Sequence, residues 1–366
     1  MLKKVFVFAS FLCLASFTFS QEETNTLGGS DVDQSTMDSL GLVNPALQQK
    51  YNDGIRALNN EKYSDAVSLF TEVINIDNSY LNAYLNRGKA YAGLGKGEEA
   101  AKDFDKVILM DAGNHEAPYF KGSALMDAGD YEGAAEAFNV ALERKNSEPK
   151  YAYFKGVAQF QAGNYDDAIK SFDKAIMIQP SYAYAYNDRG SSKMQIEDFD
   201  GAIRDYQNAI KYDANLSFAY NNLGSAYKAK EDYTNAIKYY TEAVKRDPKY
   251  YVAYNNRGSA KFEQGQFQEA LNDYGKAIEI NPEYAYAYNN KASVFIKMEN
   301  YTEAVKMCDK AISLEEEYLE AFLNRGIAKE MLKDLDGACA DWENAFILGS
   351  ESAEQYVNGP ACAESK

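Results

Sequence analysis

The chain has 366 residues, 55 acidic against 38 basic side chains, a net charge of -17 and a single histidine. An acidic surface repels a phosphate backbone, so we expect no nucleic-acid partner. One histidine is too few for most catalytic triads and metal sites, and the sequence has neither a phosphate-binding glycine loop nor a zinc-ligand spacing. These features predict a protein that is not an enzyme and binds no metal or cofactor.

Residues 1–20 predict an export signal. Lys3 and Lys4 precede an apolar run, and small residues before Gln21 suit cleavage at that point. The alternative is an uncleaved membrane anchor, but the apolar run is short for a membrane span and is interrupted by polar residues. We therefore expect an exported protein, periplasmic or extracellular, that has no membrane span after cleavage.

Residues 21–44 are polar and acidic, with few large apolar side chains. Such a segment cannot bury enough surface to offset the entropy of ordering, so we expect it to be disordered. Asn44 followed by Pro45 is a typical helix start, because asparagine caps the helix and proline suits its first turn. The repeat domain is therefore expected to span 45–352.

A unit of 34 residues repeats from Leu47 to Ser352. When Tyr251 is taken as position 1, glycine stands at position 8 of every copy but one, which has Ala292. A fixed period of this length is typical of a solenoid, in which each unit packs on its neighbours. The nine copies are 47–80, 81–114, 115–148, 149–182, 183–216, 217–250, 251–284, 285–318 and 319–352, and a C-terminal cap follows at 353–366.

Each unit is expected to form two helices. Apolar and small residues recur at spacings of three and four in two stretches, which places each set on one side of a helix. Gly265 separates the stretches, since glycine adopts the left-handed conformation that ends a helix, and Pro282 follows the second helix. Alanine stands at position 20 in all nine copies, which indicates a close contact between helices.

Position 4 is usually tyrosine, and position 24 is aromatic in every copy except the one with Cys308. Together with glycine at 8 and alanine at 20, this pattern resembles the tetratricopeptide repeat of secreted bacterial proteins. Position 11 departs from the family pattern, with Lys193, Lys261 and Lys329 in place of aromatic residues. The resemblance implies an all-α fold, a right-handed superhelical solenoid of nine helix-turn-helix repeats. It also implies a concave groove that binds a protein or peptide.

Positions 2, 6, 9 and 13 share one face of the first helix, and the resemblance implies that this face lines the groove. Asparagine is frequent at position 6 and at position 5, and its amide can both donate to and accept from a peptide backbone. This row resembles the asparagine ladder of a sugar-transferring tetratricopeptide enzyme, although the side chains could also be merely solvated. With the aromatic residues at position 2, the predicted groove residues are Asn86, Tyr184, Asn187, Phe218, Asn221, Asn222, Asn255, Asn256, Tyr286, Asn289, Asn290 and Asn324.

Arginine at position 7 and aspartate at position 23 occur together in four repeats, and position 23 is acidic in no other repeat. Position 7 lies on the first helix and position 23 on the second. A planar ion pair that joins the two helices explains the pattern better than capture of a ligand by the arginines. The predicted pairs are Arg87 with Asp103, Arg189 with Asp205, Arg257 with Asp273, and Arg325 with Asp341.

Three cysteines lie beyond the signal. Cys308 fills an aromatic position, so we expect a buried thiol. Export implies an oxidising compartment, and the chain beyond Gly349 is about long enough to return Cys362 to the side of Cys339. The ending also resembles secreted bacterial repeat proteins with a Gly-Ala-Cys-x-Asp-Trp motif and a later cysteine. We expect a disulfide between Cys339 and Cys362 that fixes the cap; the alternative is that all three thiols are reduced.

The sequence therefore favours a non-enzymatic scaffold that holds an extended peptide or a partner protein in its concave groove. The alternative is a structural array of an envelope assembly that self-associates through its ends or tyrosine-rich edges without a peptide ligand. The residues do not identify the partner.

Overall fold

The computed structural model describes residues 45–359 and Cys362. These residues form nineteen helices and no strand, which confirms the all-α repeat fold. The predicted signal at 1–20 and the acidic segment at 21–44 lie outside the described residues, and so does most of the cap beyond Gly359. None of the described helices is long and apolar enough to cross a bilayer.

The helices follow the predicted 34-residue frame, with two helices in each repeat. The first helices are α2 (Pro45–Asn59), α4 (Leu81–Gly93), α6 (Glu116–Asp127), α8 (Pro149–Gln161), α10 (Ala183–Gln195), α12 (Ser217–Ala229), α14 (Tyr251–Glu263), α16 (Ala285–Lys297) and α18 (Leu319–Met331). The second helices are α3 (Tyr63–Ile76), α5 (Gly97–Met110), α7 (Tyr131–Arg144), α9 (Tyr165–Ile178), α11 (Phe199–Tyr212), α13 (Tyr233–Arg246), α15 (Phe267–Ile280), α17 (Tyr301–Leu314) and α19 (Leu335–Ile347). A short helix, α20 (Glu351–Val357), follows the last repeat.

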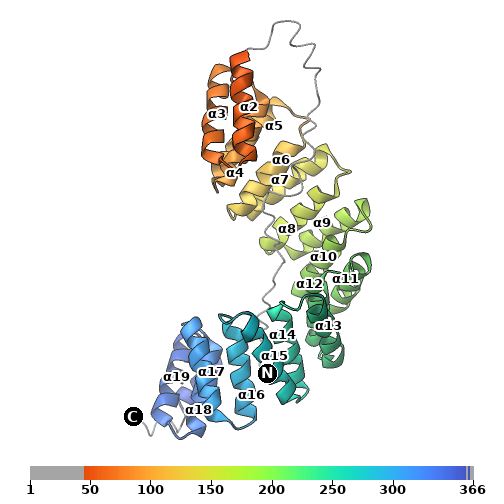
Figure 1. The fold of residues 1–366 in the computed structure, drawn as a ribbon. Coiled ribbons are helices and arrows are strands. Elements are labelled where there is room, and N and C mark those ends of the chain that lie inside the picture. The colour runs from red at the N-terminus through yellow and green to blue at the C-terminus, as the bar shows by residue number, and fades with distance from the viewer. Residues whose placement is uncertain (1–44, 360–361, 363–366) are drawn as a thin grey trace. The chain divides into compact units, whose positions relative to one another are not determined.

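The helices fall into two compact units, and the fifth repeat is divided between them. Unit 1 ends at Asp198 and holds α2 to α10; unit 2 begins at Phe199 and holds α11 to α20. Within a unit, each helix packs on the next, and first helices of adjacent repeats also touch, as α2 does α4 and α14 does α16. Figure 1 shows this order of helices along each unit. Each compact unit thus contains four complete helix pairs and one helix of the divided fifth repeat, and unit 2 also contains α20.

The turn between the two helices of a repeat requires a left-handed residue at position 15. The backbone there has a positive φ in all nine repeats, for example 75° at Gly265 and 60° at Glu231. Glycine fills this position in only four repeats, so the turn forms even where a side chain makes the conformation costly.

In seven of the nine repeats, the core contains a contact between glycine at position 8 and the ring at position 24. A Cβ added at Gly258 would lie 2.9 Å from the Tyr274 ring, and one at Gly88 would lie 2.7 Å from the Phe104 ring. The eighth repeat has Ala292 at position 8, and this is the repeat in which Cys308 replaces the aromatic residue. A methyl group at position 8 thus goes with a smaller partner at position 24, as close packing requires.

Candidate interaction surface

Arginine at position 7 joins the two helices of a repeat. Arg87 Nε donates to Asp103 Oδ2 over 2.8 Å, and its Nη2 donates to Oδ1 over 2.7 Å. Arg257 contacts Asp273 in the same way, at 2.9 and 2.6 Å. The hydrogen bonds to Asp103, and more weakly its charge, raise the pKa of Arg87 against the opposing effect of burial.

A third pair, Arg325 with Asp341, has the same two-point geometry at 2.9 and 2.6 Å. The fourth predicted pair, Arg189 with Asp205, joins residues of different units and stays a prediction. Two lysines at position 11 also contact these carboxylates: Lys261 lies 2.7 Å from Asp273, and Lys329 lies 2.8 Å from Asp341. At these two sites, the lysine that replaces the family's aromatic residue at position 11 therefore supplies a second cation to a buried aspartate.

The basic residue at position 7 has a further partner that the sequence analysis missed. It contacts position 25 of the preceding repeat, and so it joins neighbouring repeats. The contacts run from Arg87 to Thr71, from Lys121 to Asp105, from Lys155 to Asn139, from Arg189 to Asp173, from Arg257 to Thr241 and from Arg325 to Asp309. Comparing each repeat with its predecessor would have found this rule, because position 25 is polar before each of these basic residues.

The asparagines of unit 2 form two layers with different surroundings. Asn221, Asn255 and Asn289 at position 5 are buried, with 5%, 6% and 5% of their surface exposed. Each accepts, through Oδ1, a hydrogen bond from the asparagine at position 6 of the next repeat. The three bonds run from Asn256 to Asn221 at 3.0 Å, from Asn290 to Asn255 at 2.9 Å and from Asn324 to Asn289 at 2.8 Å.

This arrangement corrects part of the predicted groove. Position 5 was expected to meet a ligand beside position 6, but its buried amides are engaged inside the fold. Only the position-6 layer is partly exposed. The Oδ1 atoms of Asn256, Asn290 and Asn324 accept no hydrogen bond from the described residues, and they are not among the buried side-chain atoms without a partner. These three oxygens are therefore not fully buried, and they have no hydrogen-bond donor within the described residues.

In unit 1, the predicted groove asparagines Asn86 and Asn187 are buried and do not form the pattern of bonds seen in unit 2. Asn86 is buried and donates to Tyr51 Oη over 2.9 Å, and Asn187 is buried and donates to Asp188 Oδ1 over 2.9 Å. Neither amide is placed to meet a ligand, which corrects the prediction at these two positions. Asn222, at position 6 of the first complete repeat of unit 2, is partly exposed.

Aromatic residues at position 2 lie on the same face of the first helix as position 6. Tyr184 is 40% exposed, and Phe218 and Tyr286 are partly buried. The Tyr286 ring lies 5.5 Å from the Tyr284 ring and 5.2 Å from the Tyr318 ring. Such clustered rings offer apolar contact with limited loss of side-chain entropy on binding.

Asp188 replaces asparagine at position 6 in the fifth repeat and is a buried carboxyl group. It accepts hydrogen bonds from Tyr153 Oη at 2.7 Å and from Asn187 Nδ2. Burial raises the pKa of Asp188 to about 6, and the two hydrogen bonds lower it by less. The sequence signal that could have found it is its place at position 6, where most repeats have asparagine.

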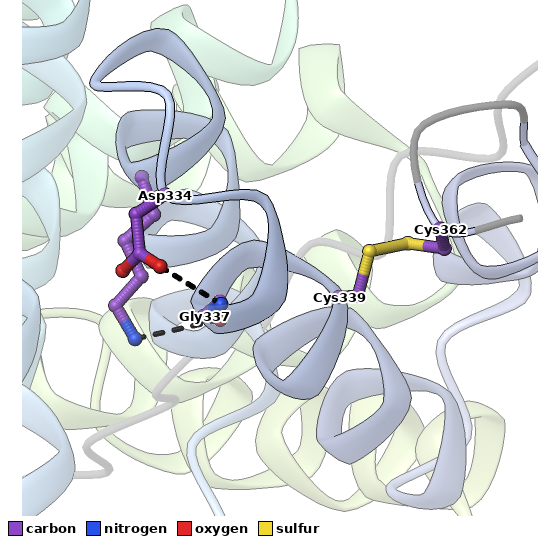
Figure 2. Close-up of a disulfide and its surroundings, with 5 residues drawn as sticks. Asp334, Gly337, Cys339 and Cys362 are labelled. Carbon is purple, nitrogen blue, oxygen red and sulfur yellow. Dashed lines mark hydrogen bonds between the residues drawn. A yellow bond between two sulfur atoms is a disulfide. The ribbon is translucent and has the colours of Figure 1, made fainter. Parts of the chain in front are cut away.

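The C-terminal cap is held against the last repeat. Cys339 on α19 and Cys362 are joined by a disulfide, as Figure 2 shows. The Trp342 ring stacks on Tyr356 of α20 at 4.7 Å between centroids. Helix α20 begins at Glu351, two residues before the predicted cap. Cys308 is a buried free thiol, and burial raises its pKa to about 12.

Within the described part of the chain, no cluster of histidine, cysteine and carboxylate side chains could hold a metal ion. What the first helices of unit 2 expose is instead a set of polar and aromatic side chains, the asparagines at position 6 and the rings at position 2.

Comparison with family models identifies the repeats. Models described as tetratricopeptide repeat match residues 51–117, 85–149, 119–184, 183–216, 217–250, 239–272 and 285–318, and a model described as TPR repeat matches 258–299. The matches together run from residue 51 to residue 318, so the chain belongs to the tetratricopeptide repeat family. A comparison with curated proteins gave no significant match.

Solved structures share the fold at low sequence identity. A tetratricopeptide repeat protein from Parabacteroides merdae is 17% identical over 66% of this chain and 97% of its own, with a TM-score of 0.55. The APC/C hetero-tetramer Cut9-Hcn1 is 14% identical over 88% and 79%, with a TM-score of 0.55. The pilF protein of Pseudomonas aeruginosa is 20% identical over 57% and 96%, with a TM-score of 0.51. These likenesses support the fold alone.

Proposed function

We propose that the chain is a non-enzymatic scaffold that binds an extended peptide or partner-protein segment along the first helices of unit 2. The observation that supports this proposal is the row of Oδ1 atoms on Asn256, Asn290 and Asn324 that have no hydrogen-bond donor within the described residues. Each of these amides is held by a bond to a buried asparagine of the preceding repeat. The repeat fold itself supports a role in protein interaction.

The chemistry favours a ligand that supplies hydrogen-bond donors. Asn256 and Asn290 each use one of their two amide N–H groups internally and Asn324 uses both, so the oxygens are the atoms that all three asparagines can offer to a partner. An extended peptide offers backbone N–H groups regardless of its sequence. First helices of neighbouring repeats pack at about 10 Å, and an extended chain rises about 3.3 Å per residue. Successive asparagines of the row would therefore contact peptide residues that are roughly three positions apart.

Two features make this row effective for binding. The internal bonds fix each side chain in advance, which reduces the entropy lost on association. Phe218 and Tyr286, at position 2 of the same helix face, are partly exposed and offer contacts for apolar side chains of the ligand. The oxygens would thus bind the backbone, and the rings would select among sequences.

We place this function outside the cytoplasm. The export signal expected at residues 1–20 and the disulfide between Cys339 and Cys362 both support an oxidising compartment, the periplasm or the exterior. The competing function is a structural array that self-associates without a peptide ligand. Light scattering on the purified chain separates the two: mass that grows with concentration favours the array, and a monomer favours the peptide-binding scaffold.

Selection from a displayed library of random peptides tests the proposal. Peptides retained by the full chain are measured by fluorescence anisotropy against the triple variant Asn256→Ala, Asn290→Ala and Asn324→Ala. The matched control replaces three asparagines on second helices of unit 2, Asn208, Asn272 and Asn344, with alanine. We expect loss of binding in the first variant only; equal binding to both variants would refute the proposed surface.

A further inference from the structure

Tyr286 on α16 is a partly exposed ring on the face of the helix that carries Asn290. One edge of its surroundings is aromatic, since the ring lies 5.5 Å from the Tyr284 ring and 5.2 Å from the Tyr318 ring. Its hydroxyl group forms no hydrogen bond with the residues that the structure describes. The ring and its hydroxyl are therefore available on the surface that holds the asparagine row.

Two carboxylates lie close to this ring. Glu315 directly follows α17, and Glu320 stands at position 2 of α18, which packs on α16. Burial, and then the charges of Glu315 and Glu320, raise the pKa of Tyr286, which places both charges near its hydroxyl group. Both carboxylates are exposed, and among the described residues neither has an ion pair or a side-chain hydrogen bond.

The segment that carries the two carboxylates is acidic. Residues 311–324 include four glutamates and no basic residue. On α16, the basic residue that shares the face of Tyr286 is Lys297, and at 1.5 Å per residue it lies about 16 Å further along the axis. The face of an aromatic ring and a carboxylate both attract a cation, so the surroundings of Tyr286 favour a positively charged group.

We propose that Tyr286, Glu315 and Glu320 bind a basic side chain, lysine or arginine, of the peptide that lies along the asparagine row. We call these three residues the cation subsite. The inference rests on the proposed function and names the ligand class, a peptide with a basic residue. The peptide backbone crosses α16 at Asn290, at position 6. Positions 2 and 6 are about 6 Å apart along the helix axis, a distance that the flexible stem of lysine spans.

The subsite predicts a preference at one position of the ligand. The net charge of -17 attracts any basic peptide to the chain, but this attraction is not tied to a position. In the two preceding repeats position 2 holds Phe218 and Val252, so the row is apolar there and acidic beside Tyr286 and Glu320. The basic residue of the peptide therefore lies toward α18, and this fixes the direction of the peptide along the row.

Substitution within a selected peptide tests the subsite. Each position of a peptide retained from the random library by the full chain is replaced in turn by lysine, acetyl-lysine or trimethyl-lysine, and fluorescence anisotropy gives the Kd. Acetylation removes the charge of lysine, whereas trimethylation keeps it. At one position we expect acetyl-lysine to bind about threefold to tenfold more weakly than lysine, and trimethyl-lysine to bind within about twofold of it.

Variants of the chain assign this preference to the subsite. Glu315→Gln with Glu320→Gln should reduce the difference between lysine and acetyl-lysine to about twofold, because only the ring remains. Tyr286→Phe should keep the difference, since it removes the hydroxyl group and retains the ring. The matched control, Glu269→Gln with Asp336→Asn, removes the same charge from exposed positions on second helices and should also keep it. Thermal unfolding of each variant confirms that the fold is retained.

The outcomes separate this inference from the proposed function. Peptides that lose binding in the Asn256, Asn290 and Asn324 triple alanine variant, but prefer lysine at no position or equally at all positions, would overturn the inference alone. The same holds for a preference that the control variant reduces as much as the subsite variant does. Peptides that bind the triple variant as tightly as the wild type, or a library from which no peptide is retained, would overturn both.

Discussion

Asn256 donates its amide N–H to the buried Oδ1 of Asn221 over 3.0 Å and so ties one repeat to the preceding one. The same relationship recurs twice further along unit 2. The asparagine at position 6 is therefore part of the packing between repeats and not only a solvated polar group. Its Nδ2 donates a hydrogen bond to the preceding repeat, and its Oδ1 remains available to a ligand.

The bond between repeats predicts coupled effects on stability. Asn255→Ala removes a buried acceptor, and Asn290→Ala leaves that acceptor without its donor, so each change should cost about 1–3 kcal/mol. The double variant should cost less than the sum, because both changes remove the same bond. Urea unfolding of the four proteins measures the coupling, and Asn272→Ala on α15 is the control. Strictly additive costs would show that the bond contributes nothing.

The ion pairs predict an asymmetry between two single changes. Arg257→Leu leaves Asp273 in contact with Lys261, whereas Asp273→Leu leaves two cations without their shared carboxylate. Losing one side of a part-buried pair costs about 3–5 kcal/mol, so we expect the aspartate change to be the more destabilising one. Thermal unfolding of both variants and of the double variant measures this order. The reverse order would contradict the geometry.

The repeat core predicts a rescue. Gly258→Ala introduces a methyl group 2.9 Å from the Tyr274 ring, and overpacking of this kind costs about 1–3 kcal/mol. Adding Tyr274→Cys reproduces the pair that the eighth repeat has at Ala292 and Cys308, so the double variant should be less destabilised than the two single changes predict together. Melting temperatures of the three variants decide the point. If the second change adds its full cost, size compensation does not explain the eighth repeat.

Asp188 predicts a pH dependence of stability. Its pKa of about 6 in the folded chain exceeds the value of about 4 in unfolded chains. The protonated carboxyl therefore favours folding, and this contribution, complete below pH 4, is lost as the pH rises through 6. Asp188→Asn should raise the free energy of unfolding at pH 7.5 by about 1–3 kcal/mol, and by much less near pH 4.

Urea unfolding at the two pH values measures this effect, with Asp166→Asn on the exposed side of α9 as control. The amide suits this position, because asparagine stands there in most repeats. A gain in stability of the same size at both pH values would mean that the ionisation of Asp188 does not matter.

The period of 34 residues was sufficient to predict the helix pairs, because alanine at position 20 and the turn at position 15 recur in register. The pairing of Arg87 with Asp103 followed from comparing positions within a repeat. The contact of Arg87 with Thr71 did not, since it joins two adjacent repeats and leaves no pattern within a single repeat. Positions 5 and 6 are adjacent in sequence, and the residue pattern does not show that Asn255 is buried while Asn256 is partly exposed.

The most direct test of the peptide-binding account removes donors from the ligand instead of from the protein. A peptide selected on the full chain is methylated at single backbone nitrogens in turn, and its Kd is measured for the wild-type chain and for the Asn256, Asn290 and Asn324 triple alanine variant. Since one lost hydrogen bond costs about 0.5–1.5 kcal/mol, methylation at roughly every third residue should weaken wild-type binding about twofold to tenfold. The same methyl groups should have no effect on binding to the triple variant. Wild-type affinity that is unchanged by methylation at every backbone nitrogen would contradict the account.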